Sequence, residues 1–102
     1  MEVKLTKENF EKEVLKSEVP VLVDFFATWC GPCRMLAPVI AAVAEEVGAS
    51  AKICKLDIDE VPEIAEAYGI ESVPTVLRFD NGVVTNGLMG FVPKDTVLAL
   101  LD

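Results

Sequence analysis

The sequence contains no histidine, and this absence excludes several kinds of catalytic centre. Ser-His-Asp triads, Cys-His nucleophile pairs and metal sites that include a histidine cannot be built within the chain. Basic side chains are also scarce, because 9 Lys and Arg accompany 17 Asp and Glu, giving a formal net charge of −8. Nucleic acids and anionic membrane surfaces attract positive patches, so we expect neither as a main partner.

Long apolar runs are missing as well. The first ten residues are mixed and charged, unlike a signal peptide, and no stretch approaches the ~20 apolar residues of a membrane-spanning helix. We therefore expect a soluble cytoplasmic protein. Its length of 102 residues, of which 52% are hydrophobic, predicts a single domain over 1–102 with a core that needs no crosslinks, and we expect a monomer.

Cysteine is used sparingly, and the odd number of three would leave one thiol unpaired in a structural disulfide framework. Two of the three form the motif Cys30-Gly31-Pro32-Cys33, which follows an apolar run and precedes a predicted helix. The N-terminus of a helix carries a partial positive charge of about half a unit, which favours thiolate over thiol. The motif therefore predicts reversible redox exchange rather than a permanent crosslink.

Two other interpretations of the motif stay open from spacing alone. It could be half of a zinc site, although such a site needs two further Cys or His ligands and only Cys54 remains. It could also be a static disulfide. Cys54 lies in the middle of a predicted strand, where an inert, buried thiol is expected more often than a regulatory one.

The order of predicted elements indicates an α/β fold, with a central mixed β-sheet flanked by helices on both faces. Asn81-Gly82 predicts a tight hairpin, Asp59 or Glu60 is expected to cap the third helix, and Thr6 the first. An edge strand near 3–5 is weakly signalled. The hydrophobic pattern predicts helices over 6–16, 31–47, 62–68 and 93–101 and strands over 19–26, 51–56, 75–79 and 83–89.

Position along the predicted helix assigns different roles to the two thiols. Cys30 stands at or before the first turn, where unpaired backbone N–H groups point at its sulfur, so we expect it to be the outer, attacking thiolate. Cys33 follows inside the same turn as the resolving thiol. Pro32 fits this first turn because it needs no N–H there, and Gly31 keeps the approach to Cys30 open.

The segment Phe25-Phe26-Ala27-Thr28-Trp29-Cys30-Gly31-Pro32-Cys33-Arg34 resembles the active-site segment of the thioredoxin family. The similarity covers essentially the whole chain and implies a thioredoxin-like fold. Departures from the common pattern are Phe26, Arg34 and the bulky Phe91. The other matching positions, in order, are Asp24, Pro38, 55–59, 68–70, 73–75, Asn81-Gly82 and Gly90.

The resemblance implies that Pro74 is a cis-proline facing the two cysteines, the alternative being a trans-proline that opens a strand. It also implies an apolar surface that docks substrates, although Trp29 could instead fill the core. The residues expected to bind substrate are Trp29, Gly31, Pro32, Val73, Pro74 and Gly90.

Asp24 interrupts the apolar run Val-Leu-Val-Asp-Phe-Phe. A carboxylate in such a run is costly to ionise, so we expect a raised pKa. The resemblance makes Asp24 the proton acceptor for Cys33 and makes Lys55, on the next strand, its charge partner. The alternative is that Asp24 lies at the end of the strand with its side chain exposed to solvent.

Taken together, the resemblance implies a general protein disulfide reductase. It would carry electrons from a thioredoxin reductase to disulfide-containing client proteins, with no metal and no bound cofactor. One alternative is a disulfide oxidase or isomerase of the same fold, although such proteins commonly have a His between the cysteines. The other is a non-catalytic subunit that binds a partner through the apolar surface.

Overall fold

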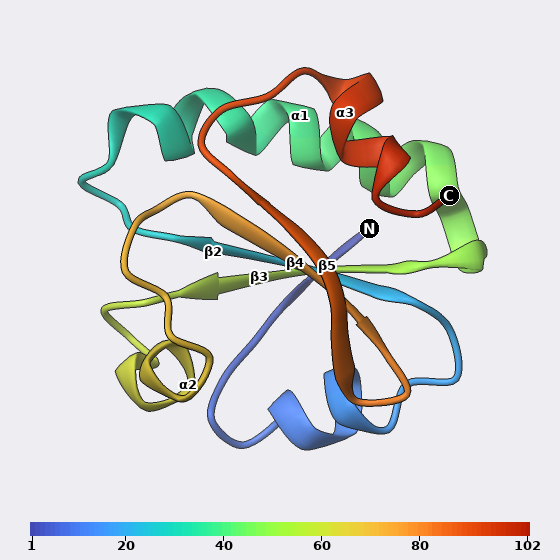
Figure 1. Cartoon of the computed structure of the whole chain (residues 1–102), viewed down its shortest axis with the longest axis horizontal. Coiled ribbons are helices and arrows are strands. Elements are labelled where there is room, and N and C mark those ends of the chain that lie inside the picture. The colour runs from blue at the N-terminus through green and yellow to red at the C-terminus, as the bar shows by residue number, and fades with distance from the viewer.

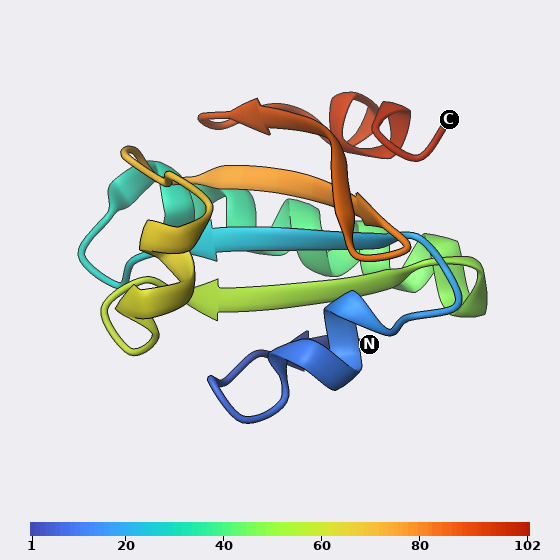
Figure 2. The same cartoon turned by 60° about the horizontal axis from the view of Figure 1, so that its bottom comes forward.

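The computed structural model describes all residues, 1–102, and contains a five-stranded mixed sheet in the order β1-β3-β2-β4-β5. β1 and β2 run parallel to β3, which lies between them, while β4 is antiparallel to β2 and β5 to β4. Figures 1 and 2 show this twisted layer from two directions. The strands are β1 (Glu2–Lys4), β2 (Val21–Phe26), β3 (Lys52–Asp57), β4 (Thr75–Asp80) and β5 (Val83–Met89).

Helices cover both faces of the sheet, as predicted. α1 (Gly31–Val47) and α3 (Lys94–Ala99) lie on one face, while α2 (Pro62–Ala67) and the short η1 (Glu11–Leu15) lie on the other (Figure 1). A 3₁₀ turn, Gly48–Ser50, ends α1. Each face has its own apolar core, because successive side chains of a strand point to opposite sides. No helix combines the length and apolarity needed to cross a bilayer.

The first predicted helix is shorter and different in type. Thr6 and Asn9 exchange hydrogen bonds between side chain and backbone, so Thr6 caps the first turn as expected. The following segment, Glu11–Leu15, is a π-helix rather than an α-helix. Phe10, which directly precedes this segment, and Val14 within it both pack into the core, in agreement with the apolar spacing.

Other boundaries differ by at most two residues, and one predicted cap is wrong. α2 has Val61 at its N-cap with no side-chain hydrogen bond, so neither Asp59 nor Glu60 caps it. The terminal helix is confined to Lys94–Ala99. The hairpin is confirmed, because Asn81 and Gly82 both have positive φ, 52° and 79°, as a type I′ turn requires.

Candidate active site

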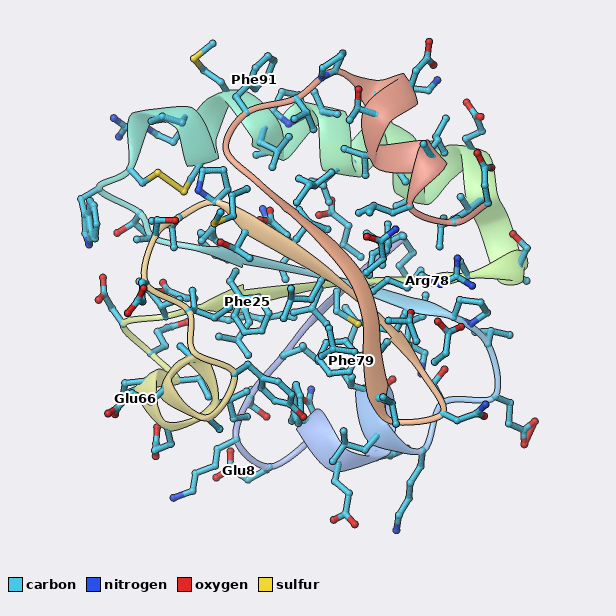
Figure 3. All side chains as sticks on the ribbon, in the orientation of Figure 1. Glu8, Phe25, Glu66, Arg78, Phe79 and Phe91 are labelled. Carbon is cyan, nitrogen blue, oxygen red and sulfur yellow. A yellow bond between two sulfur atoms is a disulfide. The ribbon has the colours of Figure 1, made fainter.

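Cys30 and Cys33 lie where β2 feeds into α1 and are joined by a disulfide, visible as the yellow bond beside the start of α1 in Figure 3. Their Cα atoms are 5.2 Å apart. Cys30 is the N-cap residue of α1, and the backbone N–H of Cys33 donates a hydrogen bond to its sulfur at 3.1 Å. The Cys30 sulfur therefore receives the donor and the dipole of the helix end, which stabilise a thiolate.

The expected contrast between an outer Cys30 and an inner Cys33 is not seen in their exposure. Cys30 is 5% exposed and Cys33 3% exposed, whereas Gly31 and Pro32 between them are exposed. Cys30 is covered because the carbonyl oxygen of Val73 lies 3.6 Å from its sulfur. The two sulfurs differ instead in their hydrogen bonding, since only Cys30 accepts the helix N–H.

The Val73-Pro74 peptide bond is cis, as expected, and the trans alternative is therefore wrong. It brings the Val73 carbonyl to the disulfide, while the Pro74 carbonyl accepts a hydrogen bond from the Gly90 N–H at 2.8 Å. Gly90 has φ +84°, a conformation that favours glycine. Pro74 itself is buried, so it supports the expected docking surface from behind and does not contribute to its exposed area.

Trp29 is 66% exposed, which excludes the alternative that it fills the core. Its indole Nε1–H donates to a carboxylate oxygen of Asp59 at 2.9 Å. No local signal in the sequence indicates this role of Asp59, because thirty positions separate the two residues and only the fold brings them together. Exposed apolar side chains also flank Gly90 in the chain: Met89 at 70% and Phe91 at 46%.

Asp24 is buried beneath α1 with 2% of its surface exposed, so the alternative of a solvent-exposed carboxylate is wrong. Neither carboxylate oxygen has a hydrogen-bond partner. Burial raises the pKa of Asp24 from 3.8 to about 6, the nearby Lys55 opposes this rise, and Glu2 adds to it. A carboxyl group with this pKa takes up and releases protons near neutral pH.

Lys55 acts on Asp24 as a nearby opposite charge, in agreement with the expected charge partnership, but it forms no direct ion pair with it. The two residues are register neighbours on β3 and β2, but the Lys55 ammonium lies 4.8 Å from the centre of the Phe26 ring. This cation–π contact stabilises the Lys55 ammonium beside the Phe26 ring instead of against the Asp24 carboxylate. Lys55 therefore acts on Asp24 through its field, which lowers the pKa of Asp24 without overcoming the effect of burial.

Cys54 lies on β3 in the opposite core and is fully buried. Burial raises the pKa of its thiol to about 12, with Lys52 opposing and Glu13 adding to the rise. These surroundings support the expectation of an inert thiol, since almost none of it is ionised at neutral pH.

Comparisons with known proteins agree with this geometry. The family model described as Thioredoxin matches residues 1–102. The chain is 46% identical to "Thioredoxin" of Porphyra purpurea over 96% of this chain and 92% of the relative. It is also 46% identical to "Thioredoxin" of Rickettsia bellii, over 96% and 93% respectively. It is 50% identical to "Thioredoxin M5, chloroplastic" of Oryza sativa over 94% of this chain, but spans only 56% of that longer protein.

Three observations agree with one another. The sequence is similar to these relatives over nearly its whole length, helices cover both faces of the sheet, and two cysteines lie at disulfide distance at a helix N-terminus. The chain can cycle between a dithiol and a disulfide, and it belongs to the thioredoxin family of protein disulfide oxidoreductases.

Proposed function

We propose that this oxidoreductase works mainly as a general reductant of protein disulfides. The observation that carries the proposal is the hydrogen bond from the Cys33 N–H to the Cys30 sulfur at the start of α1, which favours the thiolate of Cys30. A dithiol protein whose reduced form holds a stabilised thiolate beside a second thiol can attack a disulfide and then release the product.

In the first step, the Cys30 thiolate attacks one sulfur of a client disulfide. A Cys30–client disulfide forms, the client disulfide breaks, and the other client sulfur leaves as a thiolate that takes a proton from solvent. We infer that the client docks on the exposed surface formed by Trp29, Gly31 and Pro32, next to the half-buried Val73 and Gly90, with Pro74 behind them.

In the second step, Cys33 transfers its thiol proton to the Asp24 carboxylate and attacks the Cys30 sulfur. The Cys30–Cys33 disulfide forms, the second client sulfur leaves, and two electrons have passed from the protein to the client. Since Cys33 and Cys30 lie in one helical turn, this step is intramolecular and has a high effective concentration. Lys55 and burial together set the pKa of Asp24 near the working pH.

Insulin reduction with dithiothreitol tests the reductant proposal in the wild type, Cys30→Ser and Cys54→Ser. We expect Cys30→Ser to fall to the rate of dithiothreitol alone, and Cys54→Ser, which removes the thiol of the opposite core, to keep its activity. Full activity in Cys30→Ser would remove Cys30 as the nucleophile. A Cys33→Ser variant should accumulate mixed disulfides with clients, because the second step is blocked.

The reduction potential separates a reductant from the oxidase or isomerase alternative. Equilibration with glutathione buffers should give a potential clearly more negative than about −180 mV, the region of disulfide isomerases. A less negative value would favour the oxidase. The non-catalytic alternative predicts partner capture that survives in a Cys30→Ser, Cys33→Ser double variant.

We also propose that a thioredoxin reductase restores the dithiol and that the protein works as a monomer in the cytoplasm. The family membership supports a reductase partner. The compartment needs a direct test, because similar proteins include chloroplastic ones. Alkylation of Cys30 and Cys33 in fractionated cells should find the dithiol mainly reduced in the cytoplasmic fraction.

A further inference from the structure

The edge strand β1 places a second carboxylate on the sheet face that carries Asp24. Lys4 is the register neighbour of Lys55, and Lys55 is the register neighbour of Asp24. Side chains two positions apart on a strand share a face, so Glu2 lies on the same face as Lys4. The intervening Val3 packs into the opposite core, in agreement with this alternation.

Glu2 and Asp24 share an unusual feature. The buried side-chain nitrogen and oxygen atoms without a hydrogen-bond partner are only three: Oε1 of Glu2 and both carboxylate oxygens of Asp24. Burying a polar atom without a partner is costly. All three atoms belong to side chains on one face of the sheet, close to Lys55. They therefore share a single electrostatic environment.

Two adjoining hollows link this environment to Cys33. One, of about 400 Å³, is lined by Glu2, Lys4 and Asp57 among others, and the second, of about 200 Å³, by Cys33 and Ala37 among others. The residues that line both hollows are Phe26, Thr28 and Lys55. The Lys55 side chain therefore stands between Glu2 on one side and Cys33 on the other.

The charged and titratable groups that line the two hollows come from β1, β3, the segment after β3, and α1. They are Glu2 and Lys4 from β1, Lys55 and Asp57 from β3, Glu60 from the segment between β3 and α2, and Cys33 and Arg34 from α1. β4 contributes none next to Asp24, because its register neighbour is the apolar Val76. Lys4 already forms a salt bridge with Glu60 at 3.4 Å, whereas Lys55 forms none and lies near both the buried Asp24 and the half-buried Glu2.

We propose that Glu2 is a positioning residue for the proton transfer from Cys33 to Asp24, acting by competing with Asp24 for the field of the Lys55 ammonium. This inference rests on the proposed function, in which Asp24 accepts the Cys33 proton. A negative Glu2 disfavours the negative form of Asp24, so Asp24 holds its proton to a higher pH. The proton acceptor is thereby kept closer to the pH at which transfer in both directions is efficient.

The experiment is a titration of the Asp24 carboxyl carbon by ¹³C NMR, with the signal assigned by Asp24→Asn. We compare the wild type with Glu2→Gln, which removes the charge, Glu2→Asp, which keeps it, and Glu8→Gln. Glu8 is an exposed carboxylate on the far side of the molecule from α1 (Figure 3) and is the matched control for loss of one negative charge.

We expect the Asp24 midpoint to move to lower pH in Glu2→Gln, to stay near the wild-type value in Glu2→Asp, and to be unchanged in Glu8→Gln. The pH midpoint for release of product from a Cys30 mixed disulfide should move in the same direction as the Asp24 midpoint. A purely structural role would lower the melting temperature of Glu2→Gln and leave both midpoints in place.

An unchanged Asp24 midpoint in Glu2→Gln, or an equal shift in Glu8→Gln, would overturn the inference. Either outcome is independent of the proposed function, because the titration needs no client protein. Conversely, a wild-type protein that fails to reduce insulin would defeat the reductase proposal while leaving the Glu2–Asp24 coupling measurable.

Discussion

Cysteines are buried on both sides of the sheet, in opposite chemical circumstances. On the face covered by α2 and η1, Cys54 is packed among apolar side chains such as Val23, Phe25 and Phe79. On the face covered by α1, Cys33 is equally buried but lines a hollow together with Lys55, the register neighbour of Asp24. Burial is therefore the same on both faces, and the charged groups and the helix end are what differ.

This difference shows which features make a thiol reactive. Burial alone raises a thiol pKa, as it does for Cys54. A helix N-terminus supplies an N–H donor that stabilises the thiolate of Cys30, and a buried carboxyl group with a pKa of about 6 is the proposed acceptor of the Cys33 proton. The α1 face therefore contains the costly, unpaired polar atoms, and the opposite face contains none of them.

The largest expected contrast is in alkylation of the reduced protein. At pH 7, a thiol with a pKa of about 12 is ionised in ~10⁻⁵ of molecules, so native Cys54 should remain unlabelled by iodoacetamide. Cys30 should react first and Cys33 later. Mass spectrometry of peptides after timed quenching measures all three, with guanidinium-unfolded protein as the control in which the thiols become similar.

If native Cys54 were labelled at a rate comparable to that of Cys30, the conclusion that Cys54 is unreactive in its apolar core would be wrong. Faster labelling of Cys33 than of Cys30 would instead reverse the roles of the two active-site thiols.

The next effect is on stability and concerns Asp24→Asn. The pKa of Asp24 is raised from 3.8 to about 6, so the folded protein is favoured when this group is protonated. That stabilisation is fully present below pH 4 and is lost as the pH rises through 6. The difference corresponds to about 3 kcal/mol, so Asp24→Asn should be more stable than the wild type by up to that amount at pH 7.5.

Guanidinium unfolding at pH 4 and pH 7.5 measures this effect, and the advantage of Asp24→Asn should shrink towards zero at pH 4. Asp95→Asn, at an exposed position on α3, is the control and should show no such pH dependence. An equal advantage at both pH values would mean that the unpaired oxygens of Asp24, rather than its ionisation, cause the instability.

Much of the fold could be predicted from the sequence because local signals agreed with the tertiary packing. The apolar, β-branched run before Cys30 correctly predicted β2, and Asn81-Gly82 correctly predicted the hairpin. The π-helical form of Glu11–Leu15 could not be predicted, because apolar spacing does not distinguish closely related helix types. The predicted cap of α2 is wrong, because the Asp59 carboxylate accepts a hydrogen bond from Trp29 instead.

Within the candidate site, the positions were predicted better than the contacts. Asp24 was expected to be buried because it interrupts an apolar run, and it is. Lys55 was expected to be the charge partner of Asp24, and its field does lower the pKa of Asp24. Its contact with Phe26 could not be predicted, because strand register fixes which residues are neighbours but not where a long side chain points. The role of Glu2 had no local signal at all, since it depends on β1 joining the far side of β3.

The smallest expected effect concerns the exposed hydrogen bond between Trp29 and Asp59, at the edge of the α1 face. Asp59→Ala removes the acceptor of the Trp29 indole N–H, an exposed hydrogen bond, so the free energy of unfolding should fall by only about 0.5 kcal/mol. Trp29 is the only tryptophan, so its single indole N–H resonance reports the loss directly. That resonance should move in Asp59→Ala and stay in place in Glu45→Ala, which removes an exposed carboxylate on α1. Insulin reduction should change little, because Asp59 touches neither sulfur. An indole resonance that does not respond to Asp59→Ala would show that Trp29 is held by packing, and the exposed rim would then be as rigid as the core behind it.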